Sequence, residues 1–281
     1  MKIIFSRKGM DASSGGFASP IFPDQTMHSI PIWGGESSPH KYGDLAFRYQ
    51  NQPLHSVMND YTNQFRSWEN VGCHHDPMLF ETPKSLVLGQ ADRAEGHLRN
   101  QGVGVGDLFL FFGWFRQIER RDERWSYVKD APDVHQIWAF MKVEKKLAID
   151  SDANKFEVLE SFPFLSEHPH IKRLKTGNKK ESIYVSGQHE LLTYTQDRCL
   201  TDMKKYQGRS TWRLPAVFNQ PKAFSHLKVF ESDLNDVVIR YRGFGQEFVL
   251  DLDKLDSEKD RQEIVAHIER ILGTQLFQQT K

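Results

Sequence analysis

The sequence has little cysteine and no excess of either charge. Its two cysteines, Cys73 and Cys199, lie far apart and form no CxxC pair, which argues against a disulfide framework and a cysteine-rich zinc site. Lys and Arg together number 37, as do Asp and Glu, so the formal net charge is zero. A protein that holds duplex DNA mainly by neutralising phosphates carries a basic excess. The charge balance therefore favours a small nucleotide, or a base recognised in a pocket.

Long hydrophobic runs are also missing. The apolar run at the N-terminus covers only Ile3 to Phe5 and charge follows it, so we expect no signal peptide. No stretch approaches the ~20 apolar residues that span a bilayer. We therefore expect a cytoplasmic protein without a membrane partner.

Aromatic residues, in contrast, are plentiful, with 20 Phe, 6 Trp and 8 Tyr among 281 residues. A chain of this length and composition buries a sizeable core. Strand-like and helix-like segments alternate irregularly, which favours an α+β fold over a doubly wound parallel sheet. We expect a single large α+β domain over residues 1–281, with a mixed, largely antiparallel sheet and packing helices. Residues 1–116 would form its site-bearing half and residues 117–281 its supporting half.

Apolar periodicity predicts the main elements. Buried strands are expected at 2–6 and 108–112, further strands at 27–32, 135–143 and 183–185, and a late pair at 236–241 and 247–252 with Gly243 and Gly245 in the turn. Helical spacing predicts helices over 54–65 and 91–100, the second ending at Gly102. A last helix follows its cap at Ser257.

The loop after the first strand is the first candidate site. It crowds hydroxyls, cations and a carboxylate beside two glycines, and contains Ser6, Arg7, Lys8, Asp11, Ser13, Ser14, Gly15 and Gly16. Backbone N–H groups of such a loop can form an anion nest, and Arg7 or Lys8 can pair with a phosphate. The loop is neither a Walker loop nor a GxGxxG motif. The alternative is a solvated polar turn.

The second candidate is the turn His74-His75-Asp76-Pro77. A histidine two residues from an aspartate supplies a base and a carboxylate, or two metal ligands. A complete metal site needs further ligands, and none lies at a diagnostic spacing, so we assign no metal site. A capped turn is the alternative.

The third candidate lies on the helix at 91–100. His97 and Asn100, three residues apart, share a helix face, and Asn is a natural partner for an adenine edge. The alternative is a helix end that satisfies loop carbonyls. Glu95 and Arg99 form an ordinary i, i+4 pair. Trp114 could stack on a base, although core packing is the default for an aromatic residue, and Arg213 is a weaker candidate still.

Several segments carry a resemblance to a known family. They read KIIFSRKG at 2–9, SPIFPD at 19–24, HHDP at 74–77, GHLRNQG at 96–102 and GDLFLFFGWF at 106–115, with WRLP at 212–215 and GQEFVLD at 245–251. Together they resemble the third of the prokaryotic and phage families called nucleotide modification associated domain. The resemblance implies a role near modified nucleotides or DNA, in a phage or prokaryotic modification or defence setting. The family pattern leads us to expect a second acid near Met78, and its absence argues against a two-carboxylate metal site.

We therefore expect an enzyme that acts on a nucleotide or nucleic-acid base, by group transfer or glycosidic-bond chemistry. The expected catalytic residues are Asp11, Asp76, His74 and His97, and the expected ligand-binding residues are Ser6, Arg7, Lys8, Ser13 and Asn100. These side chains would have to converge on one cleft. One alternative is a binding module for modified bases that uses Trp114. The other is a metal-dependent phosphodiesterase that uses His74, His75 and Asp76. The sequence identifies no cofactor and no oligomeric state.

Overall fold

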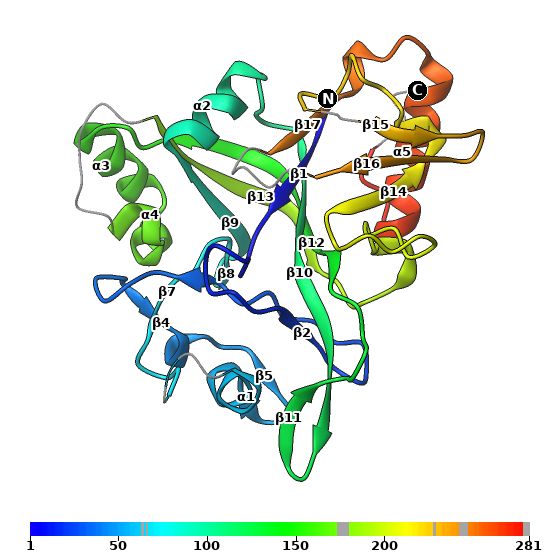
Figure 1. Cartoon of the computed structure of the whole chain (residues 1–281). Coiled ribbons are helices and arrows are strands. Elements are labelled where there is room, and N and C mark those ends of the chain that lie inside the picture. Colours follow the sequence, from blue (N-terminus) through cyan, green and yellow to red (C-terminus); the bar gives the residue numbers. More distant parts are fainter. Residues whose placement is uncertain (63–64, 66, 173–179, 227–228, 242–246, 278–281) are drawn as a thin grey trace.

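A nine-stranded mixed sheet forms the centre of the molecule (Figure 1). The computed structural model describes residues 1–62, 65, 67–172, 180–226, 229–241 and 247–277. The main strand order is β17 (Phe248–Asp251), β1 (Lys2–Arg7), β10 (Leu108–Arg121), β12 (Val134–Ala148), β13 (Glu181–Leu191), β9 (Lys84–Ala91) and β8 (Met78–Glu81). The long strand β10 also pairs with two strands outside this order, β2 (Ser19–Ile21) and β11 (Arg124–Tyr127). Only β1 and β2 run parallel to β10, while the other pairs are antiparallel. The expected α+β fold with a largely antiparallel sheet is confirmed.

Three smaller sheets and five α-helices surround this sheet in the described part of the chain. The small sheets are β14 (Thr211–Pro215) with β16 (Asp236–Arg240) and β15 (Val229–Ser232), β3 (Ile32–Trp33) with β7 (Gly72–His74) and β4 (His40–Lys41), and β5 (Arg48–Tyr49) with β6 (Gln52–Pro53). The helices are α1 (Leu54–Tyr61), α2 (Asp92–Asn100), α3 (Asp152–Ser161), α4 (Pro169–Lys172) and α5 (Glu258–Leu272). None of these helices has the length and apolar character needed to cross a bilayer.

The apolar run at the start of β10 is covered on both faces of the sheet, as the sequence predicts. Leu108, Leu110 and Phe112 pack into one core, which contains the buried face of α5 and side chains of β14 and β16. Phe109 and Phe111 pack into a second core on the opposite face, where Leu98 of α2 joins them. Successive residues of a strand point to opposite faces, so a continuous apolar run fits a strand buried on both sides.

The ends of two helices follow the expected capping. Gly102 follows α2 with a φ of +65°, a conformation that glycine adopts without strain. Ser257 caps α5 because its hydroxyl accepts a hydrogen bond from the Asp260 N–H. The helix expected over 54–65 is confirmed as α1, which is shorter and ends at Tyr61.

Two expected strands differ from the structure. Residues 27–31 form no strand: Met27 makes an isolated bridge to Ile21, and the short strand β3 begins only at Ile32. Pro31 has no N–H to donate to a ladder, which opposes pairing there. The late strands are both present but do not pair with each other, because β16 lies between β14 and β15 while β17 pairs with β1. The turn expected between them, with Gly243 and Gly245, lies outside the described residues.

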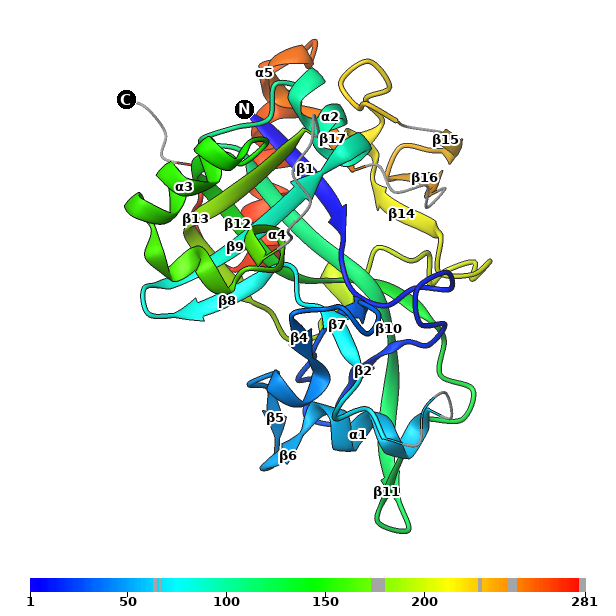
Figure 2. The ribbon, with the colours of Figure 1, turned by 90° about the vertical axis from the view of Figure 1, so that its left-hand side faces the viewer.

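The C-terminal end of β1 and the turn after β7 come together near the middle of the molecule. Figures 1 and 2 both show β1 running inward from the N-terminus to reach the β7 region. The β7 sheet rests on a small core that includes Met10, Tyr42, Trp68 and Cys73. This core anchors the loop that follows β1, through Met10, and the strand that leads into the turn, through Cys73.

Candidate functional site

A cavity of about 260 Å³ lies between the loop after β1 and the turn after β7. Five segments that are separated in the sequence supply its walls. Its lining residues are Arg7, Lys8, Gly9, Asp11, Ser14, Ile32, His74, Asp76, Gly89, Gln90 and His170. Small-molecule sites have volumes from about 300 Å³ upward, so the cavity is close in size to a site for a small ligand.

Arg7 and Lys8 reach the cavity because β1 ends there. The parallel register pairs Arg7 with Phe112 of β10, and the Lys8 N–H donates to the Phe112 carbonyl oxygen at 2.8 Å. This pairing fixes the backbone at the point where the two cations leave the sheet. Gly9 follows with a φ of +99°, and a Cβ there would lie 2.2 Å from the Ser29 hydroxyl oxygen. The turn therefore requires glycine.

Asp11 organises the loop that follows. Its Oδ1 accepts hydrogen bonds from the N–H and the hydroxyl of Ser13, both at 2.7 Å, and its Oδ2 lies 2.8 Å from Arg7 Nη2. Burial raises the pKa of Asp11, but Ser13 and Arg7 outweigh that effect and hold the pKa below its ordinary value. Asp11 is therefore an ionised partner that orients Arg7, and a weak base.

The turn after β7 directs His74 and Asp76 into the same cavity. Cys73 is buried in the small core, and its neighbour His74 points the other way, with its side chain 30% exposed. Asp76 follows with a side chain only 3% exposed. His75 lines a separate, smaller hollow of about 60 Å³, which shares Lys8, Gly9 and Asp76 with the larger cavity.

Asp76 is ionised at neutral pH. Burial alone would raise its pKa, but Lys8, His168 and His170 more than offset that effect and hold the pKa well below its usual range. The Gly89 N–H donates to Asp76 Oδ1 at 2.8 Å, and Lys8 Nζ lies 3.7 Å from Oδ2. A buried charge is retained only when such partners compensate for lost hydration.

His74 is neutral at neutral pH. Burial, with the nearby His170 and Lys8, lowers its pKa to about 4 against the opposing effect of Asp76. A neutral imidazole can accept a proton or bind a metal ion. His74 is thus an accessible base beside a fixed carboxylate.

The structure brings five of the expected site residues onto one cavity and places four elsewhere. Arg7, Lys8, Asp11, His74 and Asp76 line it. Ser13 lies on the surface and bonds only to Asp11 among its described contacts. Ser6 is fully buried and donates to Glu247 Oε1 at 2.9 Å, where the Gln90 amide also donates at 2.8 Å.

His97 and Asn100 do not line the cavity. His97 Nε2 lies 3.3 Å from the Ser225 hydroxyl, and its ring stacks on His226. Asn100 is exposed at the end of α2. The structure therefore does not bring these two residues onto the cavity that Arg7 lines.

Sequence reasoning missed His168 and His170. His168 directly precedes the short helix α4 and His170 lies in it, in a stretch where the sequence analysis predicts no element. His168 Nε2 lies 3.3 Å from Asp76 Oδ1, although it is poorly aligned for a hydrogen bond. His170 Nε2 lies 3.9 Å from Asp76 Oδ2. The pattern His168-Pro169-His170 was the available signal.

The grouping of possible metal ligands also differs from expectation. Within the described residues, the side chains close enough to share one ion are His74, Asp76 and His170, whose ligand atoms lie within 4.8 Å of one another. The sequence pointed to His74, His75 and Asp76. His75 is directed into the smaller hollow instead.

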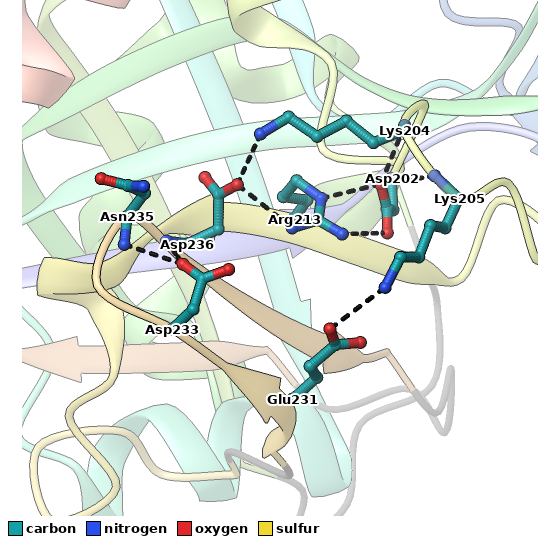
Figure 3. Close-up of polar contacts among 8 residues, drawn as sticks. All are labelled: Asp202, Lys204, Lys205, Arg213, Glu231, Asp233, Asn235 and Asp236. Carbon is teal, nitrogen blue, oxygen red and sulfur yellow. Dashed lines mark hydrogen bonds and ion pairs between the residues drawn. The ribbon is translucent and has the colours of Figure 1, made fainter.

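Trp114 and Arg213 are occupied elsewhere. The Trp114 indole donates to Asp133 at 2.9 Å, and the Arg209 guanidinium lies 3.9 Å over its ring. Arg213 makes two hydrogen bonds to Asp202 and one to Asp236 in the network of Figure 3. Glu95, expected in an ordinary helix pair, is fully buried and contacts Arg99, Lys146, Ser182 and Tyr184. All three positions have structural partners.

The family model described as nucleotide modification associated domain 3 matches residues 2–251. The match covers both the loop after β1 and the histidine turn. No curated protein and no solved structure matches the chain.

Proposed function

The chain belongs to the nucleotide modification associated domain 3 family, and from this membership we propose that it is an enzyme whose active site is the cavity between β1 and the His74–Asp76 turn. Its substrate would be a nucleotide or a nucleic-acid base, modified by group transfer or glycosidic-bond chemistry. We place this activity in a phage or prokaryotic modification or defence setting. The observation that supports the proposal most is the convergence of Arg7, Lys8, Asp11, His74 and Asp76 on one cavity.

The cationic side of the cavity suits a phosphate. Arg7 is fixed by Asp11 through one nitrogen, Nη2, and a guanidinium has further N–H donors in the same plane. Lys8 adds a second positive charge from the next position. A phosphate bound here would receive charge-assisted hydrogen bonds, which are the stronger kind. The zero net charge of the chain fits a single bound nucleotide better than a long track of duplex DNA.

The opposite side supplies a base and a fixed negative charge. His74 is neutral and partly exposed, so it can take a proton from an attacking group. Asp76 is too weak a base to compete with it, because its pKa is held well below the usual range. Its charge would instead stabilise positive charge that develops in the substrate, as at an oxocarbenium-like centre. Asp11 would position Arg7.

Activity on nucleotides tests the proposal. The purified chain would be incubated with the nucleoside mono-, di- and triphosphates and with plain and modified oligonucleotides, and the products separated by mass. We expect Asp76→Asn to lower turnover by about 100-fold or more, the range typical of a removed catalytic group.

Asp202→Asn is the matched control. Asp202 is also a buried carboxylate beside a cation, with a side chain 2% exposed, but it lies in the Figure 3 network around Arg213. This variant should lose stability and keep its turnover. Equal turnover in folded Asp76→Asn and in the wild-type chain would remove the proposed mechanism.

A further inference from the structure

The two oxygens of Asp76 have different surroundings. Oδ1 accepts the Gly89 N–H and lies beside His168. Oδ2 faces Lys8, His74 and His170 at 3.7, 4.0 and 3.9 Å, and no described residue makes a hydrogen bond to it. This oxygen has an ion pair with Lys8 and two imidazole nitrogens within 4.0 Å, but no hydrogen bond from a described residue, so its lone pairs are available to a small cation.

His170 is held as a metal ligand would be. Its Nδ1 lies 2.7 Å from Glu181 Oε1, so in the neutral ring the Nδ1 proton is donated to that carboxylate. Nε2 then carries the lone pair, and it lies 3.9 Å from Asp76 Oδ2. A histidine that donates its other nitrogen to a carboxylate is the usual arrangement around protein metal ions.

The backbone keeps this ring in place. A Cβ on Gly89 would lie 2.2 Å from His170 Cδ2, so the imidazole rests directly on the main chain of β9. The sheet therefore fixes His170 and Asp76 together, while the more exposed His74 retains freedom to rotate toward them.

Lys8 offers a competing explanation, in which its ammonium alone neutralises Asp76. However, Lys8 Nζ lies 3.7 Å from Oδ2, beyond the ~3.2 Å limit of a good N–H···O hydrogen bond. Lysine balances the charge at that distance without occupying the lone pairs. It also leaves the arrangement of Glu181, His170 and His74 unexplained.

We propose that His74, Asp76 and His170 bind a divalent first-row transition metal ion, with Glu181 as the group that orients His170. Two imidazoles and one carboxylate are ligands that Zn²⁺, Fe²⁺ and Co²⁺ accept. Metal bonds of about 2.0–2.2 Å place ligand atoms roughly 3–4 Å apart, so the present spacing closes with small side-chain rotations. All three side chains line the cavity. A role for the ion in turnover rests on the proposed function, whereas its binding does not. Because an imidazole nitrogen that binds the ion cannot also accept a proton, the base role proposed for His74 applies to the cavity without the ion.

Titration with Co²⁺ tests this site directly. The full chain would be stripped with a chelator, dialysed and titrated with Co²⁺, following the visible absorption bands, and with Zn²⁺ by calorimetry. We expect one ion per chain. Asp76→Asn and His170→Gln should weaken binding by about 100-fold or more, and Glu181→Gln by about 10–100-fold, the range found for groups that orient metal ligands.

Two further variants sharpen the result. His74→Gln changes the most exposed of the three ligands, so it should fold and still lose affinity. His75→Gln, in the same turn but directed into the other hollow, should bind Co²⁺ like the wild-type chain. Absence of Co²⁺ and Zn²⁺ binding, or unchanged affinity in His74→Gln and His170→Gln, would overturn the proposal. Metal binding without nucleotide turnover would leave the site in place and reject only the enzymatic function.

Discussion

At the scale of single residues, Lys8 connects the two roles given to the cavity. Its ammonium lies near Asp76 Oδ2 and next in sequence to Arg7, so it can serve a phosphate or oppose a metal ion. Like charges a few ångströms apart in a partly buried site repel by several kcal/mol at an effective dielectric constant of about 20. Lys8 and the ion would therefore compete for the same carboxylate oxygen.

Replacing Lys8 separates these roles. We expect Lys8→Met to strengthen Co²⁺ binding by at least about tenfold, because a repelling charge is removed, and to weaken binding of a nucleotide phosphate. Lys204→Met, a substitution of an exposed lysine in the distant Figure 3 network, should change neither. Weaker Co²⁺ binding in Lys8→Met than in the wild-type chain would show that Lys8 supports a different geometry. Calorimetry measures both affinities.

At the scale of elements, β9 holds the histidine side of the cavity. We expect Gly89→Ala to push His170 off the strand, since the added Cβ would lie 2.2 Å from the ring. Overpacking of this kind costs about 1–3 kcal/mol, and metal affinity should fall with stability.

The control for this prediction is Gly104→Ala. Nothing lies within 4 Å of a Cβ at Gly104, so the free energy of unfolding should change by less than about 0.5 kcal/mol. Denaturant unfolding compares the two variants. If Gly89→Ala were as stable as Gly104→Ala and bound Co²⁺ normally, the ring would not rest on β9 as described.

Elements with a strong local pattern could be predicted from the sequence, and their partners could not. The apolar runs of β1 and β10 and the capped helix α5 follow from side-chain alternation and from Ser257. The pairing of β17 with β1 joins residues about 250 positions apart. No local signal encodes that choice, so neighbouring strands were wrongly expected to pair.

For the candidate site as well, the sequence predicts single segments but not which segments come together. The two segments dense in polar residues, around Arg7 and around His74, both contribute to the lining of the cavity. His170 comes from a third segment whose weak periodicity hid its position. His97 carried a similar polar pattern but faces Ser225. Polarity in the sequence identified candidate segments, while the sheet topology decided which of them meet.

At the scale of the whole molecule, the buried His135 and the half-buried His267 link stability to pH. Burial lowers the pKa of His135 well below its ordinary value and that of His267 to about 4. In the unfolded chain both titrate near about 6.5. Between about pH 4 and pH 6.5 the unfolded state therefore binds more protons than the folded state. The contribution of these histidines to the free energy of unfolding is complete above this pH range and is lost as the pH drops through it.

Thermal unfolding at several pH values checks this expectation. The melting temperature should fall steadily from pH 7 to pH 4.5, and His267→Gln should make the fall less steep. His267 lies on α5, far from the cavity, with its ring against Phe218. A melting temperature that does not change with pH, or an equal slope in the variant, would contradict the burial of these rings in their neutral form.

In the proposed function, the end of β1 forms the phosphate side of a nucleotide site. Calorimetric titration of the wild-type chain and Arg7→Met with a nucleoside 5′-monophosphate and with the matching nucleoside tests it most directly. Hydrogen bonds to charged groups contribute about 1.5–3 kcal/mol, so Arg7→Met should bind the monophosphate at least about tenfold more weakly and the nucleoside equally well. Equal affinity of both chains for the monophosphate, or no binding by the wild-type chain, would contradict the claim.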